Sequence, residues 1–475
     1  MTHEKKTKIV ATLGPSTADK GILKGMMEAG ANVFRINFSH ADYAEVQKRV
    51  ELIRTLEEET GISVAILADL QGPKLRVGTM QDDVVVQPGD QISFCTGQRF
   101  EGTLQKVYMN YDLFPQDVKP GEHILLDDGK LMFKVLETNG KDQVITEVVQ
   151  GGPLRSNKGV NLPNTDISLP ALTDKDKQDA VFAISLDVDW IALSFVRDKK
   201  DVLELRELIE ANVDHKIPII AKIEKPEAVK NLEEIAKTAD GLMVARGDLG
   251  VEVPASDVPL IQKETVLTAK RARIPVIIAT QMMESMIDSM TPSRAEVNDV
   301  ANSVMDGADA VMLSGETSVG KYPVQVIETI ASICERVESS TRIKVPHQPP
   351  VIRTKRYITK SVCYHAAKIA NEIDAKVICT LTNSGYTAFQ ISAWRPDAHI
   401  LVFTSNRRIL SRLNLLWGVR AFFYDKHVST DETIEDVNKI ATQKRYTEQG
   451  DFLVNLAAMP IVDRGMVNTL RISQA

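Results

Sequence analysis

The sequence predicts an α/β protein: a (β/α)8 TIM barrel with an inserted small β-barrel lid domain and a C-terminal α/β domain. Three observations lead to this prediction. Short apolar runs alternate with amphipathic helical segments through most of the first 340 residues, as in a parallel barrel. The stretch between Asp69 and Trp190 has a different texture. A second alternation of helices and strands follows a proline-rich segment beyond Arg336.

Eight apolar runs of strand length are the predicted barrel strands. Helical patterns follow many of them; Val297, Val300, Ala301, Val304 and Met305, for example, recur at helical spacing. Buried strands separated by helices fit a closed parallel barrel better than an open sheet. The predicted strands are Lys8–Leu13, Val33–Ser39, Val64–Asp69, Trp190–Phe195, Ile217–Glu224, Gly241–Ala245, Val276–Thr280 and Ala310–Ser314.

The stretch after the third predicted strand is rich in Val, Gly and turn sequences. Turns are indicated at Pro88–Asp90, Asp127–Lys130 and Gly151–Pro153, and apolar residues alternate along Lys130–Leu136. These features predict a small antiparallel β domain inserted into the barrel. An insertion there would lie over the C-terminal mouth of the barrel, where a lid would sit.

The segment Lys344–Arg353, with three prolines, is predicted to be a linker. Beyond it we expect a helix over Ile358–Ile373 and strands at Val377–Leu381, Ile400–Phe403, Val419–Phe423 and Phe452–Asn455. The predicted domain organisation is residues 1–70 for the first part of the barrel and 71–168 for the lid. Residues 169–343 form the rest of the barrel, and 344–475 form the C-terminal domain.

Bulk properties are those of a globular protein. The 475 residues suggest about three domains at roughly 150 residues each. A formal net charge of −7 argues against nucleic acid or an anionic membrane as a partner. The chain has no apolar signal region and no membrane-length run, and its four cysteines lack metal-type spacing. We therefore expect a cytoplasmic protein.

Polar residues gather where the predicted barrel strands end, which is where barrel enzymes place their catalytic groups. Residues two apart on a strand share a face. Any single pair could be a structural salt bridge, but buried strands should not repeatedly end in unpaired charge. Together these groups predict a pocket for a metal–phosphate ligand. The sets predicted to share a face are Arg35, Asn37 and Ser39; Lys222 and Glu224; Arg246 and Asp248; and Ser314 and Glu316.

Residues Gly315–Lys321 almost spell a phosphate-binding P-loop. The next residues are Tyr322 and Pro323, so the metal-binding Ser or Thr is missing and proline cannot extend a helix from there. The sequence therefore argues against a P-loop.

Several motifs closely resemble those of the pyruvate kinase family, in order along the whole chain. They are Phe34–His40, Ala68–Arg76, Ala221–Glu224, Met243–Gly250, Ala279–Met286, Thr291–Glu296 and Met312–Thr317. The resemblance implies a barrel, a lid and a regulatory C-terminal domain. It also implies transfer of the phosphoryl group of phosphoenolpyruvate to ADP, giving pyruvate and ATP.

The resemblance also implies roles for single residues. Glu224 and Asp248 would ligate a divalent metal, Mg²⁺ or Mn²⁺, that also holds substrate oxygens. Arg35 and Lys222 would meet the transferring phosphoryl group. The backbone of Gly247 and the hydroxyl of Thr280 would receive the substrate carboxylate. The expected nucleotide-binding residues are Arg76, Lys158, Asn37, Phe38, Ser39 and His40. The expected catalytic residues are Lys222, Arg35, Thr280 and Ser314, and water near Thr280 and Ser314 could supply the proton that completes pyruvate.

The chain departs from the family at its monovalent-cation site. Relatives often bind K⁺ near Asn37, Ser39, Asp69 and Leu70 with help from a Glu, and this chain has Lys74 at that Glu position. An ammonium group can supply the same unit charge, so we expect no K⁺ requirement. A lysine that merely points to solvent is the alternative.

A second departure concerns regulation. The loop Thr382, Asn383, Ser384, Gly385, Tyr386 and Thr387 resembles the phosphate-binding loop for an allosteric effector, at the start of a helix. The final segment, Met459–Ile472, lacks the Trp- and Arg-bearing pattern of relatives regulated by fructose 1,6-bisphosphate. We therefore expect a sugar monophosphate or AMP, and a plain helix cap is the alternative for the loop. A homotetramer is expected from the resemblance alone.

Two other classes of function compete with this interpretation. A barrel lyase or aldolase acting on phosphoenolpyruvate or pyruvate would not need Lys158 or Lys222. A regulatory binder without activity should have lost one of Arg35, Lys222, Glu224 or Asp248, and all four are present. The sequence does not give the effector, the proton donor, the nucleotide preference or the rates.

Overall fold

The computed structural model describes residues 5–82, 84–163, 165–340, 356–426, 428–459 and 466–475. The predicted linker Lys344–Arg353 lies outside the described residues, as do positions 460–465 of the final segment. In the part of the chain that is described, no helix is both long and apolar enough to cross a membrane.

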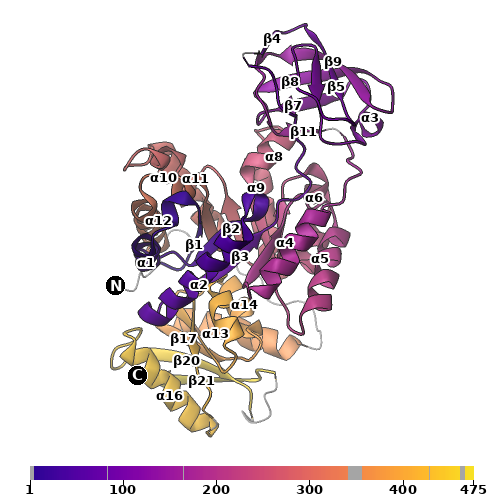
Figure 1. Cartoon of the computed structure of the whole chain (residues 1–475). Coiled ribbons are helices and arrows are strands. Elements are labelled where there is room, and N and C mark those ends of the chain that lie inside the picture. The colour runs from indigo at the N-terminus through magenta and orange to yellow at the C-terminus, as the bar shows by residue number, and fades with distance from the viewer. Residues whose placement is uncertain (1–4, 83, 164, 341–355, 427, 460–465) are drawn as a thin grey trace.

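Eight parallel strands close into a barrel in the order β1-β16-β15-β14-β13-β12-β3-β2. All eight were predicted, with ends that agree to within two residues. Most of their residues are buried because side chains fill the barrel inside and helices cover it outside (Figure 1). The strands are β1 (Lys8–Thr12), β2 (Val33–Asn37), β3 (Ala65–Asp69), β12 (Trp190–Leu193), β13 (Ile219–Ile223), β14 (Gly241–Ala245), β15 (Val276–Ala279) and β16 (Ala310–Leu313).

The surrounding helices carry conventional start and stop signals. Ser293 and Glu296 form a capping box at the start of α10 (Arg294–Asp306), and Gly307 ends it at φ 97°. Of its periodic residues, Val300 and Val304 face the core, whereas Val297 is exposed. The other barrel helices are α1 (Lys20–Glu28), α2 (Tyr43–Thr60), α4 (Asp174–Ser185), α5 (Lys199–Asn212), α6 (Pro226–Lys230), α7 (Leu232–Thr238), α8 (Arg246–Glu252), α9 (Val258–Ala272), α11 (Gly315–Ser318) and α12 (Pro323–Glu338).

The predicted insertion lies between β3 and β12 and forms a separate β domain. Its main sheet has the order β11-β7-β8-β9-β5-β6, antiparallel except for the β5–β6 pair, and it has a hydrophobic core of its own. The domain stands clear of the barrel on the side of α8 (Figure 1). Its elements are β4 (Val85–Val86), β5 (Gln91–Cys95), β6 (Lys106–Tyr108), α3 (Phe114–Asp117), β7 (His123–Leu126), β8 (Leu131–Thr138), β9 (Gln143–Gln150), β10 (Gly152–Pro153) and β11 (Val160–Asn161).

The C-terminal domain is a five-stranded sheet in the order β19-β18-β17-β20-β21. The first four strands are parallel and were predicted; the last, β21, is antiparallel and was not. The elements are α13 (Tyr357–Glu372), β17 (Val377–Leu381), α14 (Tyr386–Ala393), β18 (His399–Thr404), α15 (Arg408–Arg412), β19 (Val419–Phe423), α16 (Thr430–Gln443), β20 (Phe452–Ala457) and β21 (Thr469–Gln474).

This domain closes the end of the barrel opposite the lid (Figure 1). Phe389 of α14 packs near Trp190, with ring centroids 6.5 Å apart, and Leu415 belongs to the hydrophobic cluster inside the barrel. A buried ion pair joins Arg395 to Asp309 at 2.9 Å. The domain boundaries predicted from the sequence stay predictions.

Candidate functional site

The mouth of the barrel holds a cluster of buried charges around Lys222, at the end of β13. Its Nζ lies 3.0 Å from Glu224 Oε1 and 3.3 Å from Asp69 Oδ1. The same ammonium donates a hydrogen bond of 2.7 Å to Ser194 Oγ. Arg35 donates from Nε to Asp69 Oδ2 at 2.6 Å. The predicted Lys222 and Glu224 are therefore brought together, and Asp69 links them to Arg35.

Lys222 and Asp69 hold each other in the ionised state. Burial alone would lower the pKa of Lys222, but the carboxylates of Asp69 and Glu224 outweigh it and raise that pKa above its ordinary value. Burial acts to raise the pKa of Asp69, but Lys222 and Arg35 together hold it below its ordinary value. The Lys222 ammonium is therefore favoured in its charged form although its side chain is only 11% exposed.

The pKa of Glu224 is shifted in the opposite direction to that of Asp69. Burial raises the pKa of its carboxyl, nearby Lys222 opposes the rise, and Asp248 adds to it. Oε2 accepts a hydrogen bond from the backbone N–H of Phe195 at 2.8 Å, whereas Oε1 is buried and accepts no well-aligned hydrogen bond. Oε1 faces the Lys222 ammonium at 3.0 Å. Two neighbouring carboxylates such as Glu224 and Asp248 supply the oxygen donors that a hard divalent cation prefers.

The described residues contain no group of three or more His, Cys, Asp or Glu side chains that could hold a metal alone. Glu224 and Asp248 would therefore supply two ligands, and oxygens of a bound substrate would complete the shell. The residues fit such a metal because they are two neighbouring carboxylates, and Asp248 lines a cavity between the lid and the barrel.

The backbone of Gly247 and the hydroxyl of Thr280 also lie together. Gly247 N donates a hydrogen bond of 2.7 Å to Thr280 Oγ1. Thr280 and Gln281 have φ values of 68° and 55°, which are unfavourable for residues with a side chain. Arg246 holds this backbone, since its Nη2 donates a hydrogen bond of 2.7 Å to Thr280 O. The same guanidinium donates to both carboxylate oxygens of Asp299.

Two of the predicted shared faces are wrong. β14 ends at Ala245 and a helix begins at Arg246, so Arg246 and Asp248 do not alternate along a strand. Arg246 serves the Thr280 backbone instead of lining the pocket. β16 likewise ends at Leu313, and Glu316 is buried, accepting hydrogen bonds from the N–H groups of Met283 and Ser314. In both places a helix begins within two residues of the end of the strand.

The predicted nucleotide residues fall into two groups. In the lid, Arg76 pairs through its backbone with Gly159, next to Lys158, and Lys158 forms an ion pair of 2.9 Å with Asp127. At the barrel, the side chain of Asn37 accepts a hydrogen bond from Ser39 N, and the carbonyl of Phe38 accepts one from Lys175. The side chain of His40 lies outside the described part of the chain.

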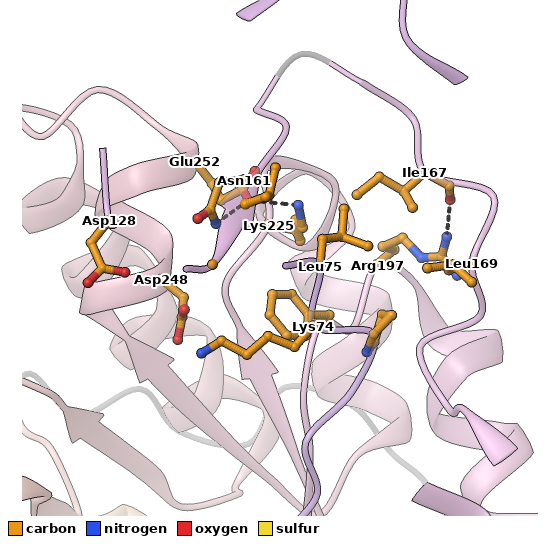
Figure 2. Close-up of a pocket in the computed structure, with 14 residues that line it drawn as sticks. Lys74, Leu75, Asp128, Asn161, Ile167, Leu169, Arg197, Lys225, Asp248 and Glu252 are labelled. Atoms are coloured by element: carbon orange, nitrogen blue, oxygen red, sulfur yellow. Dashed lines mark hydrogen bonds and ion pairs between the residues drawn. The ribbon is translucent and has the colours of Figure 1, made fainter. Parts of the chain in front are cut away.

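A cavity of about 40 Å³ lies between the lid and the barrel (Figure 2). Lys74, Asp128, Asp248 and Glu252 are among its lining residues. Figure 2 shows the amine of Lys74 extending toward Asp248. Lys74 forms no ion pair with Asp69 among the described residues. Leu70 lies close to the charge cluster, because its carbonyl accepts a hydrogen bond from Ser194 Oγ.

The predicted effector loop borders a much larger cavity, of about 680 Å³, in the C-terminal domain. Thr382 Oγ1 accepts a hydrogen bond from the N–H of Gly385. Gly385 is the N-cap residue of α14 and has a φ of 79°. The guanidinium of Arg356 lies 4.5 Å from the Tyr386 ring. Loop residues Thr382, Asn383, Ser384, Tyr386 and Thr387 all line this cavity, as do Arg356 and Lys426.

Comparison with known proteins agrees with this architecture. A profile described as the pyruvate kinase barrel domain matches residues 4–327, and one described as the pyruvate kinase alpha/beta domain matches residues 360–473. The chain belongs to the pyruvate kinase family.

Relatives of the pyruvate kinase family match nearly the whole chain. The pyruvate kinase of Corynebacterium glutamicum is 43% identical over 469 residues, covering 99% of this chain and 97% of the relative. That of Geobacillus stearothermophilus is 41% identical over 478 residues, covering 99% and 80%. A crystal structure of a pyruvate kinase from Cryptosporidium parvum superposes with a TM-score of 0.91 at 32% identity, covering 99% and 96%. The chain is accordingly a phosphotransferase.

Sequence analysis missed two hydroxyls in this pyruvate kinase site. Thr12, at the end of β1, accepts a hydrogen bond of 3.0 Å from Arg35 Nη1. Ser194, just after β12, joins Lys222 to the Leu70 carbonyl. Both stand at strand ends, so the rule that found Lys222 could have found them. Small uncharged side chains are common at such positions, and this weakens the signal.

We expect Arg246→Lys to raise the half-saturating phosphoenolpyruvate concentration by about tenfold, because lysine cannot hold Asp299 and the Thr280 carbonyl together. Steady-state kinetics would measure it. The control is Arg206→Lys, since Arg206 Nη2 also binds a carboxylate (Asp240) and a backbone carbonyl (Thr238), at the opposite end of the barrel. Equal kinetics for the two variants would contradict a role for Arg246 in holding Thr280.

Proposed function

We propose that this chain transfers the phosphoryl group of phosphoenolpyruvate to ADP, with Lys222 and Arg35 neutralising the group in transit. The observation that carries the proposal is the buried Lys222 ammonium, held between Asp69 and Glu224 and kept charged by them. A loose phosphoryl-transfer transition state needs positioning and charge neutralisation more than it needs a base.

The reaction has two steps. The bond between phosphorus and the enol oxygen breaks as a terminal oxygen of ADP takes the phosphoryl group, which leaves the enolate of pyruvate. Protonation of the enolate carbon then gives pyruvate. Lys222 and Arg35 would contact the phosphoryl oxygens. The backbone of Gly247 and the hydroxyl of Thr280 would bind the substrate carboxylate. Water near Thr280 and Ser314 is the proposed proton source.

We assign the divalent metal, Mg²⁺ or Mn²⁺, to Glu224 and Asp248. A cation there supplies positive charge to the oxygens of the substrate carboxylate and enolate. The support is the proximity of the two carboxylates and the position of Asp248 in the lining of the cavity between the lid and the barrel.

The proposed nucleotide contacts are Arg76 and Lys158 in the lid, with Asn37, Phe38, Ser39 and His40 at the barrel. Arg76 and Lys158 lie on adjacent segments at the base of the lid. The ion pair of Lys158 with Asp127 would have to open, or be shared, when nucleotide phosphates arrive. A lyase or aldolase would have no use for these lid cations.

We expect Lys222→Met to lower the rate of phosphoryl transfer by two orders of magnitude or more, since losing a buried charged stabiliser costs on the order of 3 kcal/mol in the barrier. Metal-dependent binding of phosphoenolpyruvate should persist, and enolisation of pyruvate should survive better than transfer.

Coupled assays and proton exchange into pyruvate would measure the two activities. The matched control is Lys230→Met, which removes an exposed lysine at the end of α6. Near-normal turnover of Lys222→Met would refute the assigned role.

We propose further that the enzyme does not require K⁺, because Lys74 provides the monovalent charge. The amine of Lys74 turns toward Asp248 in the cleft, and this supports a role inside the site (Figure 2). A K⁺ ion in the site of Asn37, Ser39, Asp69 and Leu70 would then meet like-charge repulsion. Lys74 is not in contact with Asp69 here, so closure of the cleft would have to bring the two nearer.

Activity in buffer with tetramethylammonium as the balancing cation should change little when K⁺ is added. Lys74→Glu should become dependent on K⁺, whereas Lys134→Glu, on the exposed face of β8, should not. Steep activation of the unmodified protein by K⁺ would show that Lys74 does not replace the ion.

The large C-terminal cavity is the proposed effector site. Hydroxyls of the Thr382–Thr387 loop, Arg356 and Lys426 suit one phosphate, and the aromatic rings of Tyr386, Phe403 and Tyr424 offer a face for a sugar or a base. A ligand that prefers one conformational state there would shift the affinity for substrate.

We expect sugar monophosphates or AMP to lower the half-saturating phosphoenolpyruvate concentration, with little effect from fructose 1,6-bisphosphate. Titration at subsaturating substrate would compare the compounds. Ser384→Asp should abolish the response by repelling phosphate, and Ser185→Asp, on the exposed end of α4, should leave it intact. A response to the bisphosphate alone would contradict the proposal.

A homotetramer and a cytoplasmic location complete the proposal. Exposed apolar side chains on and near α9 and α10, namely Leu260, Leu267, Met290 and Val297, support burial of that face against another copy. All four cysteines are free and buried, as expected in a reducing compartment.

A further inference from the structure

Glu252, the last residue of α8, forms a three-way contact between the lid and the barrel. Its Oε1 accepts a hydrogen bond of 2.8 Å from Lys225 Nζ and one of 2.9 Å from Asn161 Nδ2 (Figure 2). Its Oε2 is buried and accepts no hydrogen bond among the described residues. One carboxylate oxygen thus carries both contacts.

The three residues belong to segments that carry the proposed site. Lys225 directly follows Glu224, and Glu252 lies one helical turn after Asp248 in α8. Asn161 ends β11 of the lid, three residues after Lys158. Glu252 therefore connects the two proposed metal ligands with the lid strand that leads from the proposed nucleotide lysine.

The ion pair between Lys225 and Glu252 is buried, and burial restricts the movement of both side chains. The side chains of Lys225 and Glu252 are 9% and 1% exposed. Breaking such a pair leaves an uncompensated charge in a poorly hydrated place, so the pair should persist while the lid moves. Lys225 also lies 5.9 Å from the ring of Phe195, whose N–H holds Glu224. The barrel side of the contact is therefore rigid, and Asn161 is the tether from the lid.

A second lid connection has its own contact with the barrel, from Arg197 Nη1 to the carbonyl of Ile167 at 2.9 Å. This bond joins a side chain to a backbone carbonyl in the connection and does not reach the elements that bear Glu224 and Asp248. Among the hydrogen bonds of the described residues, the one between Asn161 and Glu252 ties the lid to those elements.

We propose that Glu252 is a positioning residue that fixes the pivot of the lid over the metal carboxylates, so that closure brings Lys158 to a set distance from Asp248. The bond from Asn161 persists through closure and acts as the pivot. This inference rests on the proposed nucleotide role of Lys158, and the test therefore includes a measurement that needs no catalysis.

The main variant is Asn161→Ala, which removes the tether and leaves the Glu252–Lys225 pair intact. We expect the KM for ADP to rise about tenfold, the worth of one hydrogen bond to a charged group, with kcat changed less than twofold. Binding of phosphoenolpyruvate with Mg²⁺ should be unchanged. Hydrogen exchange of backbone amides in residues 155–163 should accelerate in the variant without any ligand.

Two further variants sharpen the test. Asn161→Asp keeps the shape and places a carboxylate against Glu252, so it should raise the KM for ADP more than Asn161→Ala does. Asn139→Ala is the matched control: this lid amide accepts hydrogen bonds from Lys141, Asp142 and Gln143 in the turn between β8 and β9, away from the barrel. It should leave both the KM for ADP and the exchange of residues 155–163 unchanged.

The outcomes separate the pivot from the proposed function. An unchanged KM for ADP and unchanged exchange in Asn161→Ala would overturn the pivot, as would a lower KM, which would mean that the bond opposes closure. Faster exchange with an unchanged KM would overturn the link between the pivot and nucleotide binding. Failure of the proposed function would appear instead as absence of ADP-dependent pyruvate formation in the unmodified enzyme.

Discussion

The structure depends on one arrangement of charge: an ammonium group held between two carboxylates at the mouth of a packed barrel. Burial acts to lower the pKa of Lys222, and Asp69 and Glu224 together raise it above its ordinary value. Each carboxylate in turn has a second task, since Asp69 holds Arg35 and Glu224 faces Asp248. The barrel supplies the rigidity that keeps these groups close before any ligand arrives. Preorganised charge of this kind requires little rearrangement when the phosphoryl group moves.

Sequence reasoning recovered the architecture because the barrel strands are buried on both faces. Such strands appear as short, nearly continuous apolar runs, and all eight were found. The last strand, β21, was missed because it lies at the edge of its sheet and includes the polar residues Thr469, Arg471 and Ser473. Partial exposure removed the apolar signal on which the other predictions relied.

The alternation rule predicts which site residues lie together only where those residues belong to a strand. Lys222 and Glu224 span the end of β13, and the alternation rule placed them together correctly. The same rule was wrong for Arg246 and Asp248, because a helix begins at Arg246. In a helix, residues two apart do not share a face. Contacts made across the fold, such as Arg246 with Asp299 or Asn161 with Glu252, have no local signature in the sequence. Only the folded chain reveals which distant residues meet.

The C-terminal domain contributes to the interior of the barrel, and this has a consequence for synthesis on the ribosome. The last barrel strand ends at Leu313, but Leu415, which joins the cluster inside the barrel, is made 102 residues later (415 − 313). At roughly 5–20 residues per second, the unfinished barrel keeps an apolar opening beside Trp190 for about 5–20 s. During that time the nascent chain exposes a surface that chaperones recognise. Truncation before α14 would make this temporary exposure permanent, so a shortened chain should aggregate even though its eight strands are complete.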